Sequence, residues 1–198
     1  MAFTIDDAFL PATLTAPPMT DDEFAAFCAE HPDLRIEMTA EGELIIMPPT
    51  CFSTGDQNSE IGTQLRLWSK KDGRGKTVDS STGFVLPNGA RRSPDASWVL
   101  KTRIPQSKRD GFLHICPDFV IELRSPSDRL HRLKNKMHEY LDNGAQLGWL
   151  VDPVNQSVTI YRPNRVPETR KDINSIAGEE PVAGFVLDLV EVWNPLGE

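Results

Sequence analysis

The chain has 198 residues, of which 39% are hydrophobic and 25% charged, an ordinary balance for a globular protein, and its length suits a single domain over residues 1–198. Its net charge is -8. No apolar run approaches the ~20 residues that a membrane helix needs, and the first residues lack the pattern of a secretory signal. We therefore expect a cytoplasmic protein without a membrane partner. Three widely spaced cysteines, and four histidines without HxH or HExxH spacing, argue against a disulfide framework and a zinc site.

A helix and a hairpin are predicted over residues 20–49, ahead of the main core. Thr20 and Glu23 have the spacing of a capping box, with Thr20 as the N-cap residue. The segment 35–49 alternates as a hairpin does, turns at Gly42 and stops at two consecutive prolines. These elements are expected to form an N-terminal extension.

The main core is predicted over about residues 58–161. A helix over 58–71 is expected first, because its apolar residues recur at helical spacing. Strands at 77–86 and 95–101 follow, separated by a Pro-Asn-Gly turn. The segment 119–123 is nearly all apolar, which is typical of a strand covered on both faces.

A second core helix is predicted directly after that strand, with Ser125 as its N-cap, Pro126 in its first turn and Asp128 at its third position. Three further strands are expected, at 148–152, 157–161 and 184–193. The succession of strand, helix and strand favours at least one parallel pair joined by a right-handed crossover. The predicted fold class is therefore α/β (α+β), with a mixed sheet flanked by helices.

Two acids stand at strands of this core. Glu122 lies within an apolar strand, and Asp95 begins the strand before it. A buried acid must be paired, hydrogen-bonded or metal-bound, and neighbouring strands lie ~4.8 Å apart. The two acids could thus share one hard cation such as Mg²⁺, which would activate water and offset charge on a phosphate. The alternative is an ion pair from Glu122 to Arg124 or Lys136 that only fixes the sheet.

Basic residues are concentrated around these acids. Residues 60–136 hold 16 Lys and Arg against 8 Asp and Glu, so this segment could present a positive groove to nucleic acid despite the acidic total. Arg91 and Arg92 belong to it, and the alternative is that they lie on solvated loops. On the second helix Lys134 and Lys136 border opposite sides of the apolar stripe, and the helical pattern does not choose between them.

Arg129 and Arg132 lie on the Lys136 side of that helix and form a basic ridge. Such a ridge either contacts phosphates or is a solvated helix face.

A series of distinct short motifs extends from the first hairpin to the end of the chain. They are Glu37, Gly42-Glu43 and Pro48-Pro49, then Pro94-Asp95, then Pro117-Asp118, Glu122, the SPSD run at 125–128, Lys136, Tyr140, Gly144 and the WLVDP run at 149–153, and finally Gly184-Phe185, Leu187 and Trp193. This pattern resembles the Uma-two family, a bacterial group of restriction-endonuclease-like proteins in the PD-(D/E)XK nuclease superfamily. The resemblance covers nearly the whole chain.

The resemblance implies a restriction-endonuclease-like core that cleaves DNA with Mg²⁺ or Mn²⁺. Asp95 and Glu122 would hold the metal, and Lys136 would be a catalytic lysine that has moved from the strand to the helix. Glu60, on the first core helix, would be an additional acid. Arg124 stands where the superfamily usually has its lysine, and it can bind a phosphate through two parallel hydrogen bonds.

Two function classes are therefore expected. The first is a metal-dependent DNA endonuclease, which the set of Asp95, Glu122 and Lys136 favours. The second is a catalytically inactive nuclease-fold module that binds nucleic acid or a protein partner, which the overall acidity keeps open. A homodimer is compatible with either class.

Overall fold

The computed structural model describes residues 11–17, 19–106 and 111–195. In chain order its helices and strands are β1 (Ala12–Thr15), α1 (Asp21–Glu30), β2 (Arg35–Met38), β3 (Glu43–Met47), α2 (Phe52–Asp72), β4 (Gly75–Asp79), β5 (Phe84–Val85), β6 (Arg91–Arg92), β7 (Ala96–Leu100), β8 (Phe119–Leu123), α3 (Leu130–Asp142), β9 (Leu147–Asp152), β10 (Ser157–Tyr161), β11 (Glu168–Lys171), β12 (Ser175–Ala177), β13 (Val186–Asp188) and α4 (Val190–Trp193). The predicted mixture of helices and mixed sheet is confirmed.

A six-stranded sheet forms the centre of the fold, in the order β11-β10-β9-β8-β7-β4. β8 and β9 run parallel and are joined through α3, as the predicted crossover requires. β7 and β8 run antiparallel, with Ala96 opposite Ile121. Asp95 and Glu122 stand one residue beyond that pair, so they lie opposite each other where β8 approaches its end.

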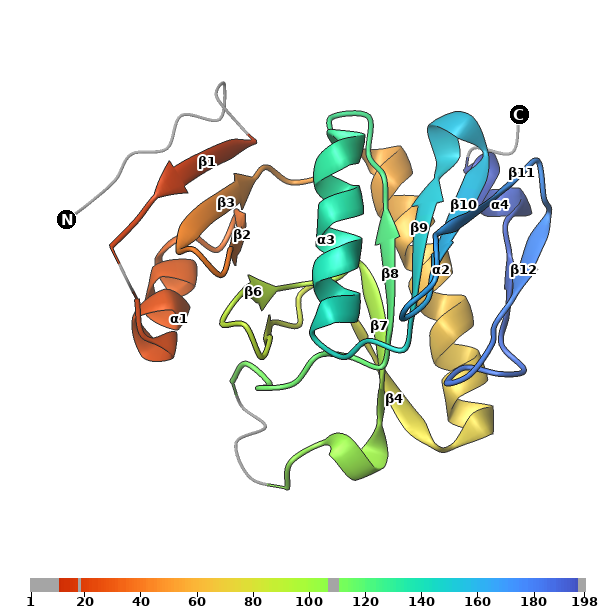
Figure 1. Cartoon of the computed structure of the whole chain (residues 1–198). Coiled ribbons are helices and arrows are strands. Elements are labelled where there is room, and N and C mark those ends of the chain that lie inside the picture. The colour runs from red at the N-terminus through yellow and green to blue at the C-terminus, as the bar shows by residue number, and fades with distance from the viewer. Residues whose placement is uncertain (1–10, 18, 107–110, 196–198) are drawn as a thin grey trace.

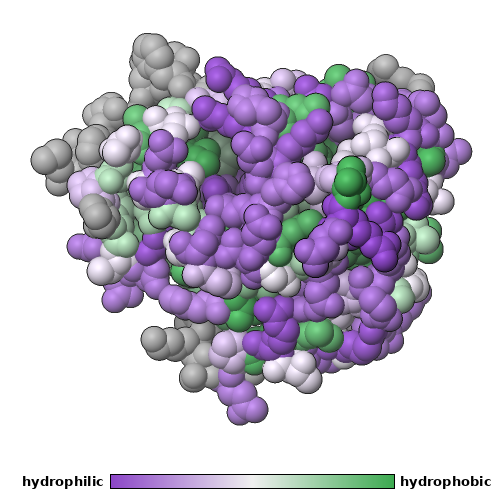
Figure 2. Space-filling model, viewed as in Figure 1, coloured by the Kyte–Doolittle hydropathy of each residue, from purple (hydrophilic) through white to green (hydrophobic). Residues whose placement is uncertain are grey.

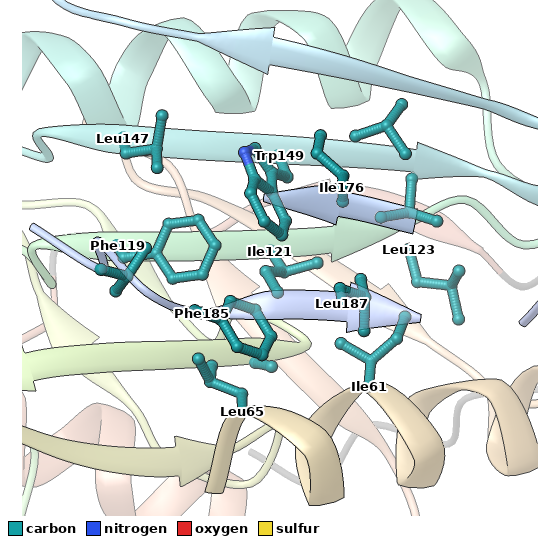
Figure 3. Packing of buried hydrophobic residues seen from close by; sticks show 14 of the residues in the cluster. Ile61, Leu65, Phe119, Ile121, Leu123, Leu147, Trp149, Ile176, Phe185 and Leu187 are labelled. Atoms are coloured by element: carbon teal, nitrogen blue, oxygen red, sulfur yellow. The ribbon is translucent and has the colours of Figure 1, made fainter. Parts of the chain in front are cut away.

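Helices cover both faces of this sheet (Figure 1). α3 packs on one face, and α2 lies on the other together with the β12–β13 pair and α4. Alternation along β8 separates the two faces: Ile121 packs with Leu65 of α2 (Figure 3), whereas Val120 packs with Met137 of α3. Because Glu122 follows Val120 by two residues, its side chain belongs to the α3 face.

A second sheet, in the order β1-β3-β2-β6-β5, lies beside α3 and carries α1 (Figure 1). Its β2–β3 hairpin agrees with the prediction. The capping box of α1 is confirmed: the Thr20 hydroxyl accepts a hydrogen bond from the Glu23 N–H at 3.3 Å, and the Glu23 carboxylate accepts one from the Thr20 N–H at 2.8 Å. Through β2 this sheet brings Arg35 and Glu37 to the central one.

Two predicted boundaries in the first half of the chain are wrong. α2 begins at Phe52 rather than near residue 58. The strand predicted at 77–86 is two strands, because a turn in which the Thr82 N–H donates to the Asp79 carbonyl sends β4 and β5 into different sheets.

Ser125 is not the N-cap of the second core helix, which begins at Leu130 after Arg129. Instead the Asp128 carboxylate accepts hydrogen bonds from the backbone N–H of Ser125 at 2.8 Å and from its hydroxyl at 2.7 Å. These local bonds compete with helix formation and close a turn.

The strand predicted at 184–193 is also shorter than expected. β13 ends at Asp188, whose carboxylate accepts a hydrogen bond from the Val190 N–H at 2.9 Å. The short helix α4 then follows.

The surface seen in Figure 2 is mostly hydrophilic, with hydrophobic residues in small separate patches. Among the described residues, no helix combines the length and the hydrophobicity needed to cross a membrane.

Candidate functional site

A cavity of about 470 Å³ opens near the end of β8, between the start of α2, the first hairpin and α3. Asp95, Glu122 and Lys136 all line it, together with Arg35 and Asn58. The structure thus brings the two predicted metal ligands and the predicted catalytic lysine to one place. Lys134, the rival that the helical pattern left open, is exposed on α3.

Asp95 is held from two sides and is only 9% exposed. Its Oδ2 atom accepts a hydrogen bond from the Leu123 N–H at 2.8 Å, which ties it to the end of β8. Its Oδ1 atom accepts hydrogen bonds from both terminal nitrogens of Arg35, each at 3.2 Å. The carboxylate is therefore fixed by the backbone and neutralised by a cation of the hairpin.

Glu122 is almost fully buried on the α3 face of the sheet. Its Oε1 atom accepts a hydrogen bond from the Tyr140 hydroxyl at 2.9 Å and lies 2.8 Å from the Lys136 Nζ atom. Burial raises the pKa of Glu122 to about 7, since the attraction of Lys136 does not offset it and the negative charges of Asp95 and Glu37 add to it. The Glu122–Lys136 ion pair, left open as an alternative above, is present.

Lys136 is shared between two acids. Its Nζ atom lies 2.8 Å from Glu37 Oε1 as well as 2.8 Å from Glu122. Burial opposes the charge of Lys136, but these two carboxylates outweigh it, so its pKa is raised. The lysine therefore stays protonated inside the site.

Glu37 continues this network toward the second sheet. Its Oε2 atom lies 3.2 Å from Arg92, whose Nε donates to Glu139 of α3 at 2.6 Å. Burial acts to raise the pKa of Glu37, but Lys136 and Arg92 together lower it to about 2. A row of buried charges of alternating sign thus runs from Glu122 through Lys136, Glu37 and Arg92 to Glu139.

The residues around the cavity fit a hard cation. Asn58 Oδ1 is buried and has no hydrogen-bond partner among the described residues. An unpaired buried carbonyl oxygen costs ~1–3 kcal/mol, so this atom favours a bound donor or cation. Asp95, Glu122 and Asn58 offer oxygen atoms alone, the ligand type that Mg²⁺ prefers when waters complete its shell. In the described parts of the chain no group of three or more His, Cys, Asp or Glu could hold a metal, which leaves this mixed set.

Glu60 does not line the cavity, so its predicted part as an additional acid is not supported. Its carboxylate accepts a hydrogen bond from Gln64 at 2.8 Å, and Gln64 also bonds the backbone of Asp188. α2 lines the cavity with Thr54 and Asn58 instead, and Asn58 stands ~200° around the helix from Glu60.

Arg91 and Arg92 are not available to DNA, contrary to the prediction. Their exposed fractions are 7% and 6%, and each guanidinium is held inside the protein. Arg91 donates to Asp21 at 2.6 Å, and Arg92 binds Glu37 and Glu139. These arginines join elements of the fold rather than present a positive surface.

The three other arginines predicted to bind DNA differ in exposure. Arg124 does not line the cavity. Its guanidinium donates a hydrogen bond to Asp152 at 2.8 Å, and the Arg124 side chain is 20% exposed. Arg129 and Arg132 are exposed at the start of α3, and Arg132 donates to the Thr13 hydroxyl at 3.2 Å. Of the five arginines predicted to bind DNA, Arg129 and Arg132 therefore remain open to a phosphate backbone.

Three site residues were missed as functional residues at the level of sequence: Arg35, Glu37 and Asn58. The two charged residues alternate with apolar ones in a half-buried hairpin, and this alternation was a signal that their side chains share a face. Asn58 carried no signal of its own, because a single amide near the start of a helix is common.

Comparisons with known proteins give a family and a fold for the chain. Residues 21–190 match the Uma2 family, which is described as "Putative restriction endonuclease". The chain belongs to the Uma2 family. The predicted resemblance is thereby confirmed, and the description of the Uma2 family is that of restriction-endonuclease-like proteins.

A solved structure from Anabaena variabilis ATCC 29413, described as "a putative nuclease belonging to DUF820", resembles this Uma2 protein with a TM-score of 0.75. The two share 24% identity over 89% of this chain and 98% of that chain, so the likeness shows a common fold. No curated protein matches the chain.

Proposed function

We propose that this protein is a Mg²⁺- or Mn²⁺-dependent endonuclease that hydrolyses phosphodiester bonds of DNA. The observation that carries the proposal is that Asp95, Glu122 and Lys136 line one cavity. They come from three separate places in the chain: the residue before β7, strand β8 and helix α3, respectively. Membership of a family described as "Putative restriction endonuclease" supports it.

The side chains of the cavity have different roles in the proposed reaction. Asp95 and Glu122 would hold the cation, with Asn58 as a further oxygen donor. A bound Mg²⁺ or Mn²⁺ supplies an activated water and offsets charge on the phosphate. The Lys136 ammonium lies 2.8 Å from Glu122, where it can orient the attacking water and stabilise charge that develops on the phosphate.

DNA is expected to approach past the exposed start of α3. Arg129 and Arg132 are available there for contacts with backbone phosphates. Such contacts release counterions, so the affinity for DNA should fall steeply as salt rises.

Metal binding tests the proposed site directly. Asp95→Asn and Glu122→Gln should each abolish the heat of Mn²⁺ binding in isothermal titration while the thermal unfolding transition stays cooperative. Unchanged Mn²⁺ binding in both variants would remove the site as proposed.

Plasmid nicking tests the catalytic step. Lys136→Ala should lower kcat by roughly 10²–10³-fold with little change in DNA affinity, the loss typical of one electrostatic group. Lys134→Ala is the matched control, since Lys134 is exposed on the same helix, and it should retain wild-type nicking. Full activity in Lys136→Ala would show that the lysine is assigned wrongly.

A second candidate function is an inactive nuclease-fold module. The protein's own cations already pair with Asp95 and Glu122, and the net charge of -8 disfavours DNA. A wild-type protein that binds a duplex or a protein partner but neither binds Mn²⁺ nor nicks plasmid would establish this alternative.

A further inference from the structure

Arg35 pairs with Asp95 at the wall of the cavity. Both residues line the cavity, and the Arg35 side chain remains 33% exposed. Its two terminal nitrogens reach the same carboxylate oxygen, Asp95 Oδ1. The other oxygen already accepts the Leu123 N–H, and a cation that binds Asp95 through Oδ1 competes with Arg35 for that atom.

The Arg35–Asp95 contact is a loose one. Its two N···O distances are 3.2 Å, whereas charge-assisted hydrogen bonds are typically ~2.7–2.9 Å. The comparable pair Arg103–Asp118 measures 2.6 Å, also with a buried aspartate. The Arg35 guanidinium can therefore leave its partner at less cost than Arg103 can.

Arg35 also has an unused donor. Its Nε atom is buried and finds no hydrogen-bond partner among the described residues. A guanidinium presents its N–H groups as a planar fork that matches two oxygens of a phosphate. The donor set of Arg35 is thus only partly matched by one carboxylate oxygen of Asp95 and by the Ser93 carbonyl, which accepts a long hydrogen bond from Nη2 at 3.4 Å.

We propose that Arg35 is an exchangeable cation of this site, which neutralises Asp95 in the metal-free protein and binds a DNA phosphate once a divalent cation takes Asp95. This inference rests on the proposed function. It adds the first hairpin to the substrate-binding residues and explains why a cationic side chain occupies the cavity of a metal-binding site.

The first test measures Mn²⁺ binding alone by isothermal titration. Arg35→Met removes the competing charge and should bind Mn²⁺ roughly tenfold more tightly than the wild type. Arg35→Lys keeps the charge and should stay close to the wild type. Arg103→Met, which breaks an arginine–aspartate pair outside the cavity, should leave Mn²⁺ affinity unchanged.

The second test measures anisotropy of a short fluorescent DNA duplex, with Ca²⁺ as the divalent cation or with EDTA. Arg35→Met should bind the duplex roughly tenfold more weakly than the wild type in Ca²⁺ and equally well in EDTA, because a bidentate phosphate contact forms only when metal has freed the guanidinium. Arg35→Lys, which lacks the planar fork, should lose roughly threefold in Ca²⁺.

The outcomes separate this inference from the proposed function. If the wild type does not bind Mn²⁺, the proposed function fails and the inference falls with it. If the wild type binds Mn²⁺ but a folded Arg35→Met binds it equally or more weakly, Arg35 is a structural residue and the inference alone is overturned. Should Arg35→Met not fold, full duplex affinity of Arg35→Lys in Ca²⁺ overturns the inference instead.

Discussion

Replacement of Glu37 by glutamine is expected to destabilise the protein by about 3 kcal/mol at neutral pH. Glu37 is 3% exposed, and its carboxylate accepts the Ser93 N–H at 3.0 Å beside Lys136 and Arg92. Burial works to raise its pKa, yet the two cations lower it from 4.5 to about 2. At about 1.4 kcal/mol for each tenfold change in proton affinity, this difference gives the expected loss.

The loss should depend on pH in a direction that follows from the lowered pKa. The native protein holds fewer protons at Glu37 than the unfolded chain does, so the stabilisation is full above about pH 4.5 and disappears as the pH falls toward 2. The difference between the wild type and Glu37→Gln should therefore shrink to roughly half near pH 3.

Urea unfolding followed by circular dichroism measures both quantities. Glu168→Gln is the control, because Glu168 is also paired with arginines but is exposed, and its urea midpoint should barely move. An unchanged midpoint in Glu37→Gln, or a deficit that stays constant from neutral to acid pH, would refute the idea that Glu37 is a buried charge held by two cations.

Three further results are expected. Burial raises the pKa of Glu122 to about 7, so the native protein holds an extra proton between about pH 4.5 and 7 and loses stability as the pH rises through that range. In urea titrations with EDTA, the stability of Glu122→Gln relative to the wild type should therefore rise by roughly 2 kcal/mol between about pH 5 and 8. A stability difference that stays constant over this range would contradict the expectation. Thr20→Ala removes the capping box of α1 and should lower the Tm by about 2–4 °C in calorimetry, whereas no shift would mean that α1 does not depend on its cap. Gly75→Ala would place a Cβ atom 2.1 Å from the buried Trp98 ring and should cost about 1–3 kcal/mol in urea unfolding, whereas Gly62→Ala, with nothing within 4 Å, should cost nothing.

The sequence predicts the central sheet and its helices well, because periodicity is a local property. The strands around Glu122 and Trp149 and the Thr20 cap depend on residues close together in the chain. Local patterns fail where two of them compete, as at Ser125, where a turn held by Asp128 displaces the start of the helix.

The site is predictable only in part, because its partners come from distant segments. Asp95 and Glu122 are conspicuous in the sequence, since each is an acid at an apolar strand, and the structure places both at one cavity. The burial of Arg92 depends on Glu37, 55 residues away, which no local pattern reveals. For the same reason the basic middle of the chain predicts a positive groove, although some of its arginines are buried in ion pairs with acids.

The alternating row of buried charges also limits how this sequence can change over evolutionary time. A neutral residue at the position of Lys136 would leave Glu37 and Glu122 facing each other without the cation between them. A second change, at one of these acids, would be needed to restore the balance. Substitutions in this row should thus accumulate in pairs that join the first hairpin to α3, and relatives that have lost the lysine should have lost one of its two carboxylates as well.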